Sequence, residues 1–576
     1  MPKDRDLISL LEAGVSATPH KPLYSFLDRE LTCTDTLTFA RLFDEALVLA
    51  CHLQKCGLNR TPVLLIQQKN IEFVRSFWAC LLAGAWPMPS ARPRGKKWNH
   101  LATLAVQSRA AAILTSASIA RFLPAHELLH IPVIVSDEDR AGPNSPDHEV
   151  LKRTWVRPSI CPDDIAFIQY TSGSTSKPKG VVITHANVMS NLAAISQAFD
   201  CTQHDIGLSW LPLHHDMGLI GHVLQPMFAG IHNYFMNPTD FLADPLCWIE
   251  AISTYRVTIT GGPAFAYGFC ARQIPRQHAS LRLEQWRIAY CGSDRIAAST
   301  LRQFSRYYAD SGFSSEAWFP CYGMAESTLY VCGVKGVSLA SAADAEESCV
   351  CIGNLVEEES NGGTSIRVVD PNSRKVCADG ELGEIWISSA SVSPGYYHQS
   401  ILSRQSFNLS VDGHGAFFRT GDLGFVVDRR LYFSGRLKNV IKVRGRSLHA
   451  EDIESLLQLE TIDTGLQRCV ALGIQIDDVD SFVILAEHRS RRPDQQSLGN
   501  RQLERQLKNL VCDTFGVTPH TVLILPAFSL PLTSSGKPLR SKCLDIYTDL
   551  MQSACAENKA LPARLPNARV EVRSNA

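Results

Sequence analysis

Residues 170–180 carry the segment Tyr-Thr-Ser-Gly-Ser-Thr-Ser-Lys-Pro-Lys-Gly. Short apolar runs at residues 165–168 and 181–183 flank this segment, which predicts a strand, a loop and a second strand. In the loop, glycines permit a tight backbone path, hydroxyl and amide groups donate hydrogen bonds, and lysines add positive charge. We therefore predict a loop that holds phosphate groups.

This loop differs from the phosphate-binding loop of kinases and GTPases. That motif requires a second glycine at the place where this chain has Pro178. The alternative interpretation is a solvated turn rich in serine, threonine and glycine. The motifs further along the chain favour phosphate binding over a simple turn.

The composition is ordinary for a soluble globular protein. The chain has 576 residues, of which 45% are hydrophobic and 20% charged, and its formal net charge is −1. Single hydrophobic cores stop growing near about 250–300 residues, so we expect several domains. A charge this close to zero gives no indication of a nucleic-acid surface or a polybasic membrane patch.

The N-terminus and the cysteines indicate a cytoplasmic protein. Residues 1–6 include several charged side chains, and the apolar run at residues 7–11 is too short for a signal-peptide core. No apolar run approaches the roughly 20 residues that a transmembrane helix needs. The 18 cysteines are scattered without paired CxxC units, so we expect reduced thiols and no zinc site.

Strand-like runs alternate with helical patterns over the first part of the chain. Residues 62–67 are predicted to form a buried strand and residues 70–83 the helix after it. Residues 111–115 and 131–136 repeat the strand pattern. Alternation of this kind implies parallel sheets covered by helices.

The pattern changes after about Ser360. Short strands separated by glycine-rich turns are predicted at residues 366–370, 383–388 and 430–434, which suggests a barrel-like β region. From Asn439 onward the pattern is compact α+β. Its predicted elements are strands at 440–443, 469–474, 481–488 and 521–525, and helices at 450–459 and 502–515.

A domain boundary is predicted at residues 436–438, where the pattern switches. We therefore expect an N-terminal domain over residues 1–436 and a C-terminal domain over residues 437–556. The polar, proline-containing stretch 557–576 is predicted to be a disordered tail.

Two further motifs carry side chains suited to nucleotide chemistry. Residues 320–328 place an aromatic, a glycine turn and an acid close together; Tyr322 could stack on a purine, and Glu326 could hold Mg²⁺ on phosphates. Residues 419–424 place Asp422 in a glycine turn, where a carboxylate can accept hydrogen bonds from both ribose hydroxyls.

Basic residues mark the remaining motifs. Residues 435–438 read Gly-Arg-Leu-Lys, residues 443–446 read Val-Arg-Gly-Arg, and residues 533–537 end in Lys537 on a predicted flexible loop. Taken singly, a glycine–acid turn or a serine–glycine–lysine loop is usually a surface turn. The order and spacing of all these motifs carry the stronger indication.

In that order, the motifs resemble the adenylate-forming superfamily of acyl-CoA synthetases, adenylation domains and luciferases. The resemblance extends from about residue 10 to about residue 550. It implies an α/β fold with a large N-terminal domain, made of two parallel-sheet subdomains and a distorted β-barrel. It also implies a smaller, mobile α+β C-terminal domain, with the active site between the two.

One branch of the superfamily, the fatty acyl-AMP ligases, matches further. The segments that resemble it lie at residues 210–221, 241–252, 261–267, 286–289 and 443–454. Members of this branch activate a fatty acid with ATP as an acyl-adenylate and release pyrophosphate. They then pass the acyl group to the phosphopantetheine thiol of an acyl carrier protein.

The resemblance implies nucleotide-binding roles for three groups of residues. The β- and γ-phosphates of ATP would lie under a loop containing Thr171, Ser172, Gly173, Ser174, Thr175 and Lys179. The adenine side would be formed by Gly292, Ser293, Asp294, Tyr322, Gly323, Met324 and Ala325. Asp422 would hold the ribose with Arg436 close by, and Lys438 would lie at the hinge.

The resemblance also implies catalytic roles. Lys537 would reach the fatty carboxylate and the α-phosphate, and Glu326 would bind Mg²⁺. His215, together with Met217, would border the acyl pocket beside the reacting carboxylate. For His215 the alternative is a structural histidine. Phe265 and Tyr267 are as compatible with the core as with a tunnel wall.

Two departures from the family pattern stand out. Residues 331–364 occupy the place of an insertion thought to disfavour coenzyme A, and here the segment is shorter than usual. Ser293 and Asp294 stand where alanine and glutamate are common, so the contact with the adenine region is expected to be looser. The first departure leaves the choice of acyl acceptor open.

The sequence therefore predicts a fatty acyl-AMP ligase for a medium- or long-chain fatty acid. It would use ATP and Mg²⁺, with an acyl carrier protein as partner. An acyl-CoA synthetase is the first alternative. The second is a stand-alone amino-acid adenylation enzyme, for which only Asp244 offers an acid in the region of residues 241–267. An inactive relative that binds without turnover is the third.

Overall fold

The structure is a computed structural model. It describes residues 6–93, 98–124, 128, 130–137, 152–171, 178–272, 281–293, 295–336, 350–355, 363–443, 446–461, 465–476, 479–489, 496–532 and 537–556. The predicted disordered tail at residues 557–576 lies outside this described part. Within it, no helix is both long and apolar enough to cross a membrane.

The larger sheet of the N-terminal domain has eight strands in the order β14-β13-β12-β11-β9-β10-β1-β2. Its central neighbours are parallel, whereas the edge strands β2 and β14 pair antiparallel. The strands are β1 (Pro22–Leu27), β2 (Cys33–Thr38), β9 (Ile206–Ser209), β10 (His232–Phe235), β11 (Ile259–Gly262), β12 (Ile288–Cys291), β13 (Trp318–Gly323) and β14 (Tyr330–Gly333). This is the parallel-sheet architecture that the sequence predicts.

A second parallel sheet has the order β4-β3-β5-β6. Its strands are β3 (Pro62–Ile66), β4 (Trp86–Pro89), β5 (Ala112–Thr115) and β6 (Val133–Val135). The predicted strand–loop–strand around the phosphate loop forms the antiparallel pair β7 (Ile165–Thr171) and β8 (Lys179–Thr184). The strand predictions around residues 62–67, 111–115, 131–136 and 165–183 are confirmed.

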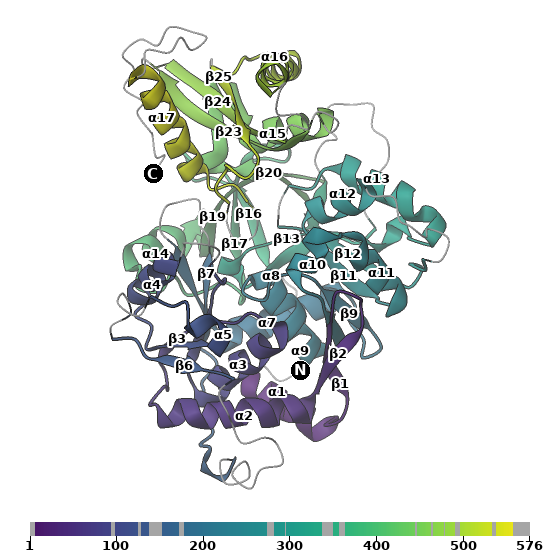
Figure 1. The fold of residues 1–576 in the computed structure, drawn as a ribbon, viewed down its shortest axis with the longest axis vertical. Coiled ribbons are helices and arrows are strands. Elements are labelled where there is room, and N and C mark those ends of the chain that lie inside the picture. The colour runs from purple at the N-terminus through teal and green to yellow at the C-terminus, as the bar shows by residue number, and fades with distance from the viewer. Residues whose placement is uncertain are drawn as a thin grey trace.

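Helices cover these sheets (Figure 1). They are α1 (Leu7–Ala17), α2 (Phe39–Lys55), α3 (Asn70–Ala83), α4 (Trp98–Gln107), α5 (Ala117–Ala120), α7 (His185–Ala198), α8 (Asp216–Leu219), α9 (Gln225–Ala229), α10 (Pro238–Ala243), α11 (Leu246–Thr254), α12 (Ala264–Arg272) and α13 (Ala298–Tyr308), with a π-helical turn η1 (Ile220–Leu224). A core of buried side chains from α1, α2, α3 and α7 fills the space between the sheets. The helix predicted at residues 70–83 is confirmed as α3.

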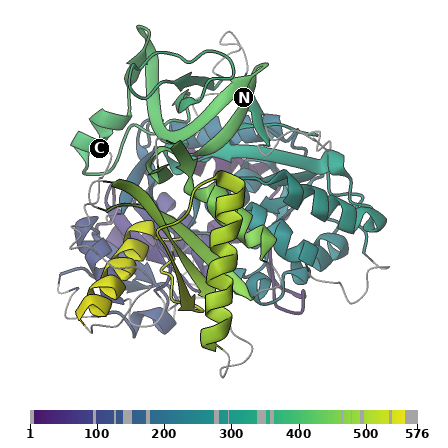
Figure 2. The ribbon, with the colours of Figure 1, turned by 90° about the horizontal axis from the view of Figure 1, so that it is seen from above.

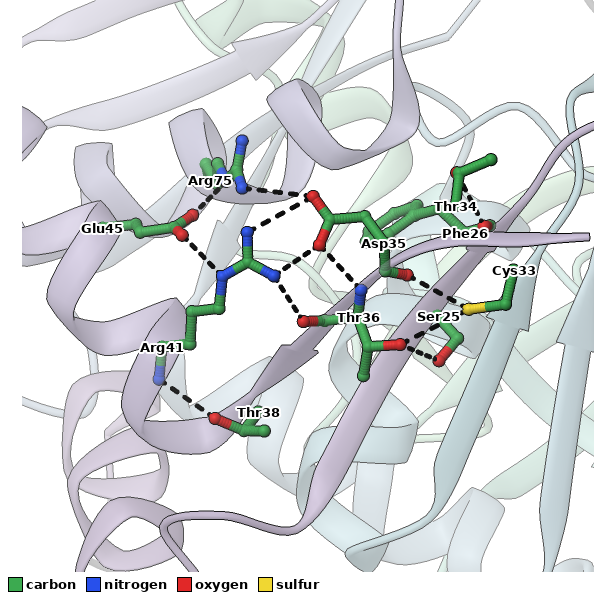
Figure 3. Close-up of polar contacts among 10 residues, drawn as sticks. All are labelled: Ser25, Phe26, Cys33, Thr34, Asp35, Thr36, Thr38, Arg41, Glu45 and Arg75. Atoms are coloured by element: carbon green, nitrogen blue, oxygen red, sulfur yellow. Dashed lines mark hydrogen bonds and ion pairs between the residues drawn. The ribbon is translucent and has the colours of Figure 1, made fainter. Parts of the chain in front are cut away.

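A charge network fixes the edge strand β2 to two helices (Figure 3). Asp35 on β2 pairs with Arg41 on α2, and Arg41 Nε lies 2.7 Å from Glu45 Oε1. Arg75 on α3 pairs with both carboxylates. Because the charges alternate and all four side chains are partly exposed, the network orients the sheet edge without burying an unpaired charge.

The predicted barrel-like region is a curled antiparallel sheet in the order β15-β20-β19-β17-β16, with β18 beside β19. Its elements are β15 (Cys351–Asn354), β16 (Ser365–Val369), β17 (Gly383–Ser388), α14 (Ser400–Ser406), β18 (Leu409–Val411), β19 (His414–Val427) and β20 (Arg430–Arg436). This sheet stands between the parallel sheets and the C-terminal domain (Figure 1).

The small C-terminal domain lies over the large one (Figure 2). Its elements are the hairpin β21 (Val440–Val443) and β22 (Arg446–His449), then α15 (Ala450–Glu460), β23 (Leu466–Ile476), β24 (Val479–His488), α16 (Gln496–Phe515), β25 (Thr521–Pro526) and α17 (Arg540–Ala556). Successive β24 side chains point to opposite faces, so Phe482 and Ile484 pack with α15 and α16, whereas Val483 packs with α17. The predicted large and small domains are confirmed, and their bounds at residues 1–436 and 437–556 stay predictions.

Candidate active site

A cavity of about 2840 Å³ lies where the two domains meet, and both domains line it. Residues that follow the carboxyl ends of β9, β11, β12 and β13 form part of its wall. In open parallel sheets, ligands bind at this edge because the loops there converge. The cavity reaches motifs that lie hundreds of residues apart, and its lining includes Thr171, Lys179, Ser293, Tyr322, Glu326, Asp422, Lys438 and Lys537.

Asp422 is a buried carboxylate of the site with a partner at each of its oxygens. Only 4% of it is exposed, and its Oδ2 accepts a hydrogen bond of 2.7 Å from the Tyr322 hydroxyl. Arg436 Nε lies 3.3 Å from Oδ1, because Asp422 and Arg436 are register partners across β19 and β20. Burial, and then the charge of Asp422, raises the pKa of Tyr322, so its hydroxyl keeps its proton and donates.

Glu384 stabilises the turn that carries Asp422. It is 1% exposed, and its Oε2 accepts a hydrogen bond of 2.7 Å from Arg419 Nε. Its Oε1 accepts a hydrogen bond of 2.9 Å from the Gly421 amide. Gly421 has a φ of +73°, a left-handed conformation that glycine adopts without a Cβ penalty. Sequence reasoning missed Glu384, since an acid in a short predicted strand resembles any solvent-facing residue.

Glu326 lies in the short helical turn η5 (Ala325–Ser327), and its Oε1 accepts a hydrogen bond of 2.9 Å from the Tyr396 hydroxyl. Lys179 Nζ lies 5.0 Å from the centre of the Tyr396 ring, a cation–π distance. Tyr396 therefore links the acid to the end of the phosphate loop. The sequence analysis did not single it out, because Tyr396 lies with Tyr397 in a segment between β17 and α14 that carries no motif.

The side chains around Glu326 are compatible with Mg²⁺ only if phosphate oxygens also coordinate the ion. Among the described residues, no group of three or more His, Cys, Asp or Glu side chains could hold a metal ion. Mg²⁺ is commonly bound by one or two carboxylates together with water and substrate phosphates. A single carboxylate beside a phosphate loop fits that pattern.

Lys438 extends into the cavity from the turn η7 (Leu437–Asn439), directly after Arg436. Burial, followed by the charges of Arg436 and Lys179, lowers the pKa of Lys438 to about 8, and the carboxylates Asp422 and Glu326 oppose the shift. The predicted hinge lysine is thus surrounded by the same charges that would meet a nucleotide. Its hinge role stays a prediction.

Lys537 crosses from the C-terminal domain into the large domain. Its Nζ donates a hydrogen bond of 2.7 Å to the Ser293 carbonyl. Ser293 has a φ of +75°, a strained conformation for a non-glycine residue, and strain of this kind clusters at functional sites. A second contact between the domains is an ion pair formed by Arg295 and Asp452.

Asp216 and the neighbouring histidines line the same cavity as Lys537. Burial raises the pKa of Asp216, and the hydrogen bond from the Met217 amide and the charge of Lys537 oppose that shift. The rings of His214 and His215 lie 4.4 Å apart. Burial, then the neighbouring His215, holds the pKa of His214 well below its usual range, so His214 is neutral.

The chain matches the AMP-binding enzyme family over residues 11–397. The chain belongs to the AMP-binding enzyme family. A relative from Moorena producens, the medium-chain-fatty-acid–[acyl-carrier-protein] ligase JamA, is 32% identical over 94% of this chain and 95% of its own. The long-chain-fatty-acid–AMP ligase FadD26 of Mycobacterium tuberculosis is 29% identical, over 94% and 97% respectively.

Solved structures give the same result. A structure from a study of fatty acyl-adenylate ligases of E. coli and L. pneumophila matches with a TM-score of 0.81 and 29% identity, covering 96% of this chain and 100% of that one. The L. pneumophila fatty acyl-adenylate ligase in complex with acyl adenylate and pyrophosphate matches with a TM-score of 0.71 and 31% identity, covering 94% and 96%. The predicted resemblance to the fatty acyl-AMP ligases is confirmed.

Most of the predicted site residues of this AMP-binding enzyme meet in one place. Those that line the cavity are Thr171, Lys179, His215, Met217, Ser293, Tyr322, Gly323, Met324, Ala325, Glu326, Asp422, Arg436, Lys438 and Lys537. Gly292 is not among the lining residues; a Cβ there would lie 2.9 Å from the Cys321 carbonyl oxygen, so it allows close packing of backbones. The individual roles of these residues stay predictions.

Some predictions on this AMP-binding enzyme fall outside the described residues. They concern Ser172, Gly173, Ser174, Thr175 and Asp294, together with residues 337–349 and 356–362 of the shortened insertion. The structure does distinguish Phe265 from Tyr267. Phe265 lines the cavity, whereas Tyr267 is fully buried. Because the Tyr267 hydroxyl donates a hydrogen bond of 2.7 Å to the Tyr290 carbonyl, Tyr267 belongs to the core.

Proposed function

We propose that this enzyme activates a medium- or long-chain fatty acid with ATP and Mg²⁺, forming acyl-AMP and pyrophosphate, and then acylates the phosphopantetheine thiol of an acyl carrier protein. The observation that carries the proposal is the single cavity. It joins the buried carboxylate Asp422, the mobile-domain lysine Lys537 and an apolar branch lined by Ile195, Phe199, Ile231 and Ile259.

The first step needs positive charge at two points. A carboxylate that attacks the α-phosphate meets charge repulsion, and further negative charge develops on the phosphorus oxygens and the leaving pyrophosphate. Lys537 would contact the carboxylate and α-phosphate, and Lys179 would contact the leaving phosphates. Removing one such preorganised contact typically costs about 2.7–4 kcal/mol of transition-state stabilisation. Mg²⁺ beside Glu326 would neutralise charge on the phosphate oxygens.

The nucleotide would be oriented by the large domain. Asp422 has both oxygens engaged by Tyr322 and Arg436, which fixes its plane before any ligand arrives. A fixed carboxylate loses little freedom when it accepts the ribose hydroxyls, so binding energy is retained for the reaction. The apolar branch would add about 0.8 kcal/mol for each buried methylene of the fatty chain.

The transfer step favours a C-terminal domain that can move away from the large domain. Lys537 is needed while the adenylate forms, and its withdrawal would open a path for the phosphopantetheine arm. We propose that rotation at Lys438 exchanges the two arrangements. All described cysteines are free thiols, which supports a reducing, cytoplasmic compartment.

The amino-acid adenylation alternative loses its one candidate acid. Asp244 does not line the cavity. Its Oδ1 instead accepts a hydrogen bond of 3.2 Å from the Leu246 amide at the start of α11. The acyl-CoA synthetase alternative concerns the second step only. It depends on whether the acceptor thiol belongs to coenzyme A or to a carrier protein.

One assay separates these possibilities. Purified protein would be incubated with ATP, Mg²⁺ and a panel of fatty acids, and with either coenzyme A or a phosphopantetheinylated carrier protein, and the products identified by mass spectrometry. We expect acyl-AMP and acyl-carrier protein, and no acyl-CoA. Abundant acyl-CoA would identify a synthetase, and the absence of acyl-AMP from every fatty acid would contradict the proposal.

A further inference from the structure

Lys537 reaches the cavity from a part of the C-terminal domain that has little regular structure. Between the end of β25 at Pro526 and the start of α17 at Arg540, the described residues form no helix or sheet strand. A catalytic side chain must be held within about 0.5 Å of its productive position. Because a misplacement of about 1 Å can cost about a hundredfold in rate, the contacts that fix this segment bear on the reaction.

Two short stretches, residues 530–532 and 537–539, lie against each other and form a two-armed stem that carries Lys537. The Leu539 amide donates a hydrogen bond of 2.9 Å to the Pro531 carbonyl, and an antiparallel bridge lies beside this bond. The backbone position of Lys537 therefore depends on where the stem docks on the rest of the domain.

The second arm continues into Arg540, which is tied to the body of the C-terminal domain. Its Nη1 and Nη2 donate hydrogen bonds of 2.6 and 2.9 Å to the two carboxylate oxygens of Glu454 on α15. Nη1 also donates 2.8 Å to the Ala471 carbonyl on β23. A bidentate pair of this kind fixes orientation as well as distance. The arm that carries Lys537 is thus anchored three residues beyond it.

The first arm is held by a buried acid that no motif marks. Glu487 on β24 is 1% exposed, and its Oε1 accepts a hydrogen bond of 2.6 Å from the Leu530 amide. The Leu530 side chain is buried in the core between the sheet and α17. Arg468, the register partner of Glu487 across β23 and β24, has its Nη1 3.9 Å from Glu487 Oε2. Without the carboxylate the buried amide would lose its acceptor, which is costly.

The backbone just before Leu530 is held under constraint. Phe528 has a φ of +67°, a left-handed conformation that is unfavourable for a bulky residue. Its side chain is 85% exposed, so burial of the ring does not account for the conformation. Strain of this kind persists where the surrounding contacts over-determine the backbone. Two residues on, the bond between the Leu530 amide and Glu487 supplies such a contact.

We propose that Glu487 is a positioning residue for acyl-adenylate formation: by holding the Leu530 amide, it fixes the stem that presents Lys537 to the cavity. The inference rests on the proposed function, because it assumes that Lys537 serves the adenylation step. Glu487 does not line the cavity, so it acts through the stem rather than on a reactant. Its loss should impair the step that needs Lys537 and spare the step that does not.

The test measures the two half-reactions separately in Glu487→Met, which keeps the length of the side chain and removes the acceptor. Fatty-acid-dependent pyrophosphate exchange reports adenylation, and transfer from synthetic acyl-AMP to the carrier protein reports the second step. We expect kcat for exchange to fall at least about tenfold, with the KM for ATP and the rate of transfer within about twofold of the unsubstituted protein. Unchanged exchange, or equal losses in both half-reactions, would overturn the inference.

Two milder substitutions at the same position test whether the accepted hydrogen bond is what matters. Glu487→Gln keeps an oxygen that can accept from the Leu530 amide, and it should retain most of the exchange rate. Glu487→Asp keeps the charge but shortens the reach by one methylene, so its exchange rate should lie between those of Glu487→Gln and Glu487→Met. Exchange as low in Glu487→Gln as in Glu487→Met would contradict the assignment. This series keeps the proposal testable even if Glu487→Met does not fold.

Two further variants in the same domain separate positioning from folding. Val511→Ala removes buried methyl groups on the opposite face of the sheet, in the core formed with α15 and α16, so it lowers the melting temperature without touching the stem. Glu504→Met removes an acid of α16 that pairs with Lys508 instead of the stem. Both should keep the ratio of exchange to transfer. A ratio that falls as far in Val511→Ala as in Glu487→Met would show that lost stability explains the effect, and the inference would be wrong.

Lys537→Ala distinguishes failure of this inference from failure of the proposed function. If Lys537→Ala loses exchange and Glu487→Met does not, the inference is wrong and the proposed function stands. If the unsubstituted protein gives no exchange with any fatty acid, the proposed function fails and the inference fails with it.

Discussion

The two sides of the active-site cavity are held by different kinds of contact. On the large-domain side, Asp422 is buried, paired across two strands with Arg436 and bonded to Tyr322. On the small-domain side, Lys537 is half-buried, and its Nζ donates a hydrogen bond to the Ser293 carbonyl of the large domain. The first side is held by strand pairing, whereas the second is held by a hydrogen bond from a side chain.

This difference matches what a two-step enzyme needs. Groups that orient the nucleotide gain from rigidity, because a preorganised site spends less free energy on ordering. A lysine that serves only the first step gains from a contact that breaks easily. Breaking contacts on each side should therefore have separable effects on activity and stability.

The largest effect is expected from Lys537→Ala. Acyl-AMP formation should fall by at least about a hundredfold, because one preorganised charge is lost from the transition state. The melting temperature should change little, since Lys537 is half-buried and its hydrogen bond is to a carbonyl oxygen, not to a buried charge. Fatty-acid-dependent pyrophosphate exchange measures the first step.

Two controls sharpen this test. Lys442→Ala alters an exposed lysine of the same domain that does not line the cavity, and it should retain activity. When supplied with synthetic acyl-AMP, Lys537→Ala should still acylate the carrier protein. Normal exchange by Lys537→Ala, or loss of transfer alone, would contradict the division of labour between the two sides.

Asp422→Asn should have the next largest effect. Hydrogen bonds to charged groups contribute about 1.5–3 kcal/mol, so the KM for ATP should rise about tenfold to a hundredfold. Unlike Lys537→Ala, this change should also lower the melting temperature, because Arg436 loses its ion-pair partner. Tyr322→Phe, which removes only the donated hydrogen bond, should have a smaller effect on both; equal effects would argue against a charge-based role.

A smaller effect is expected from the ion pair between the domains. Arg295→Ala or Asp452→Asn should lower the adenylation rate by no more than about fivefold, since partly exposed pairs contribute at most about 1 kcal/mol. The double variant should be no worse than either single one. Additive losses in the double variant, measured by pyrophosphate exchange, would show that the residues act independently.

The smallest effect is expected from pH. The pKa of Lys438 is about 8, so its positive charge is complete well below that pH and is lost as the pH rises through it. If this charge assists the nucleotide, adenylation should be halved near pH 8 and decline further above it. Lys438→Arg, which stays protonated, should remove the decline. An identical alkaline limb in both proteins would assign the titration to another group.

Much of the fold could be predicted from the chain alone. The helix at residues 70–83 and the strand at residues 383–388 match the structure residue for residue, because their apolar patterns and flanking glycines are strong local signals. The residues that complete the site could not be predicted. Glu384 and Tyr396 carry no motif, and only the pairing of β17 with β19 and the path of residues 389–399 bring them to Asp422 and Glu326.

The sequence by itself determined which local motifs the chain carries: the predicted phosphate loop, the acid of residues 320–328, Asp422 and Lys537 are set by residue type. The tertiary structure decided which of those motifs lie together and which side chains are buried. Only packing brings Lys537 to Ser293 and separates Phe265 at the cavity from Tyr267 in the core. Residue identity is set along the chain, whereas hydrogen-bond partners and burial arise from contacts between segments distant in sequence.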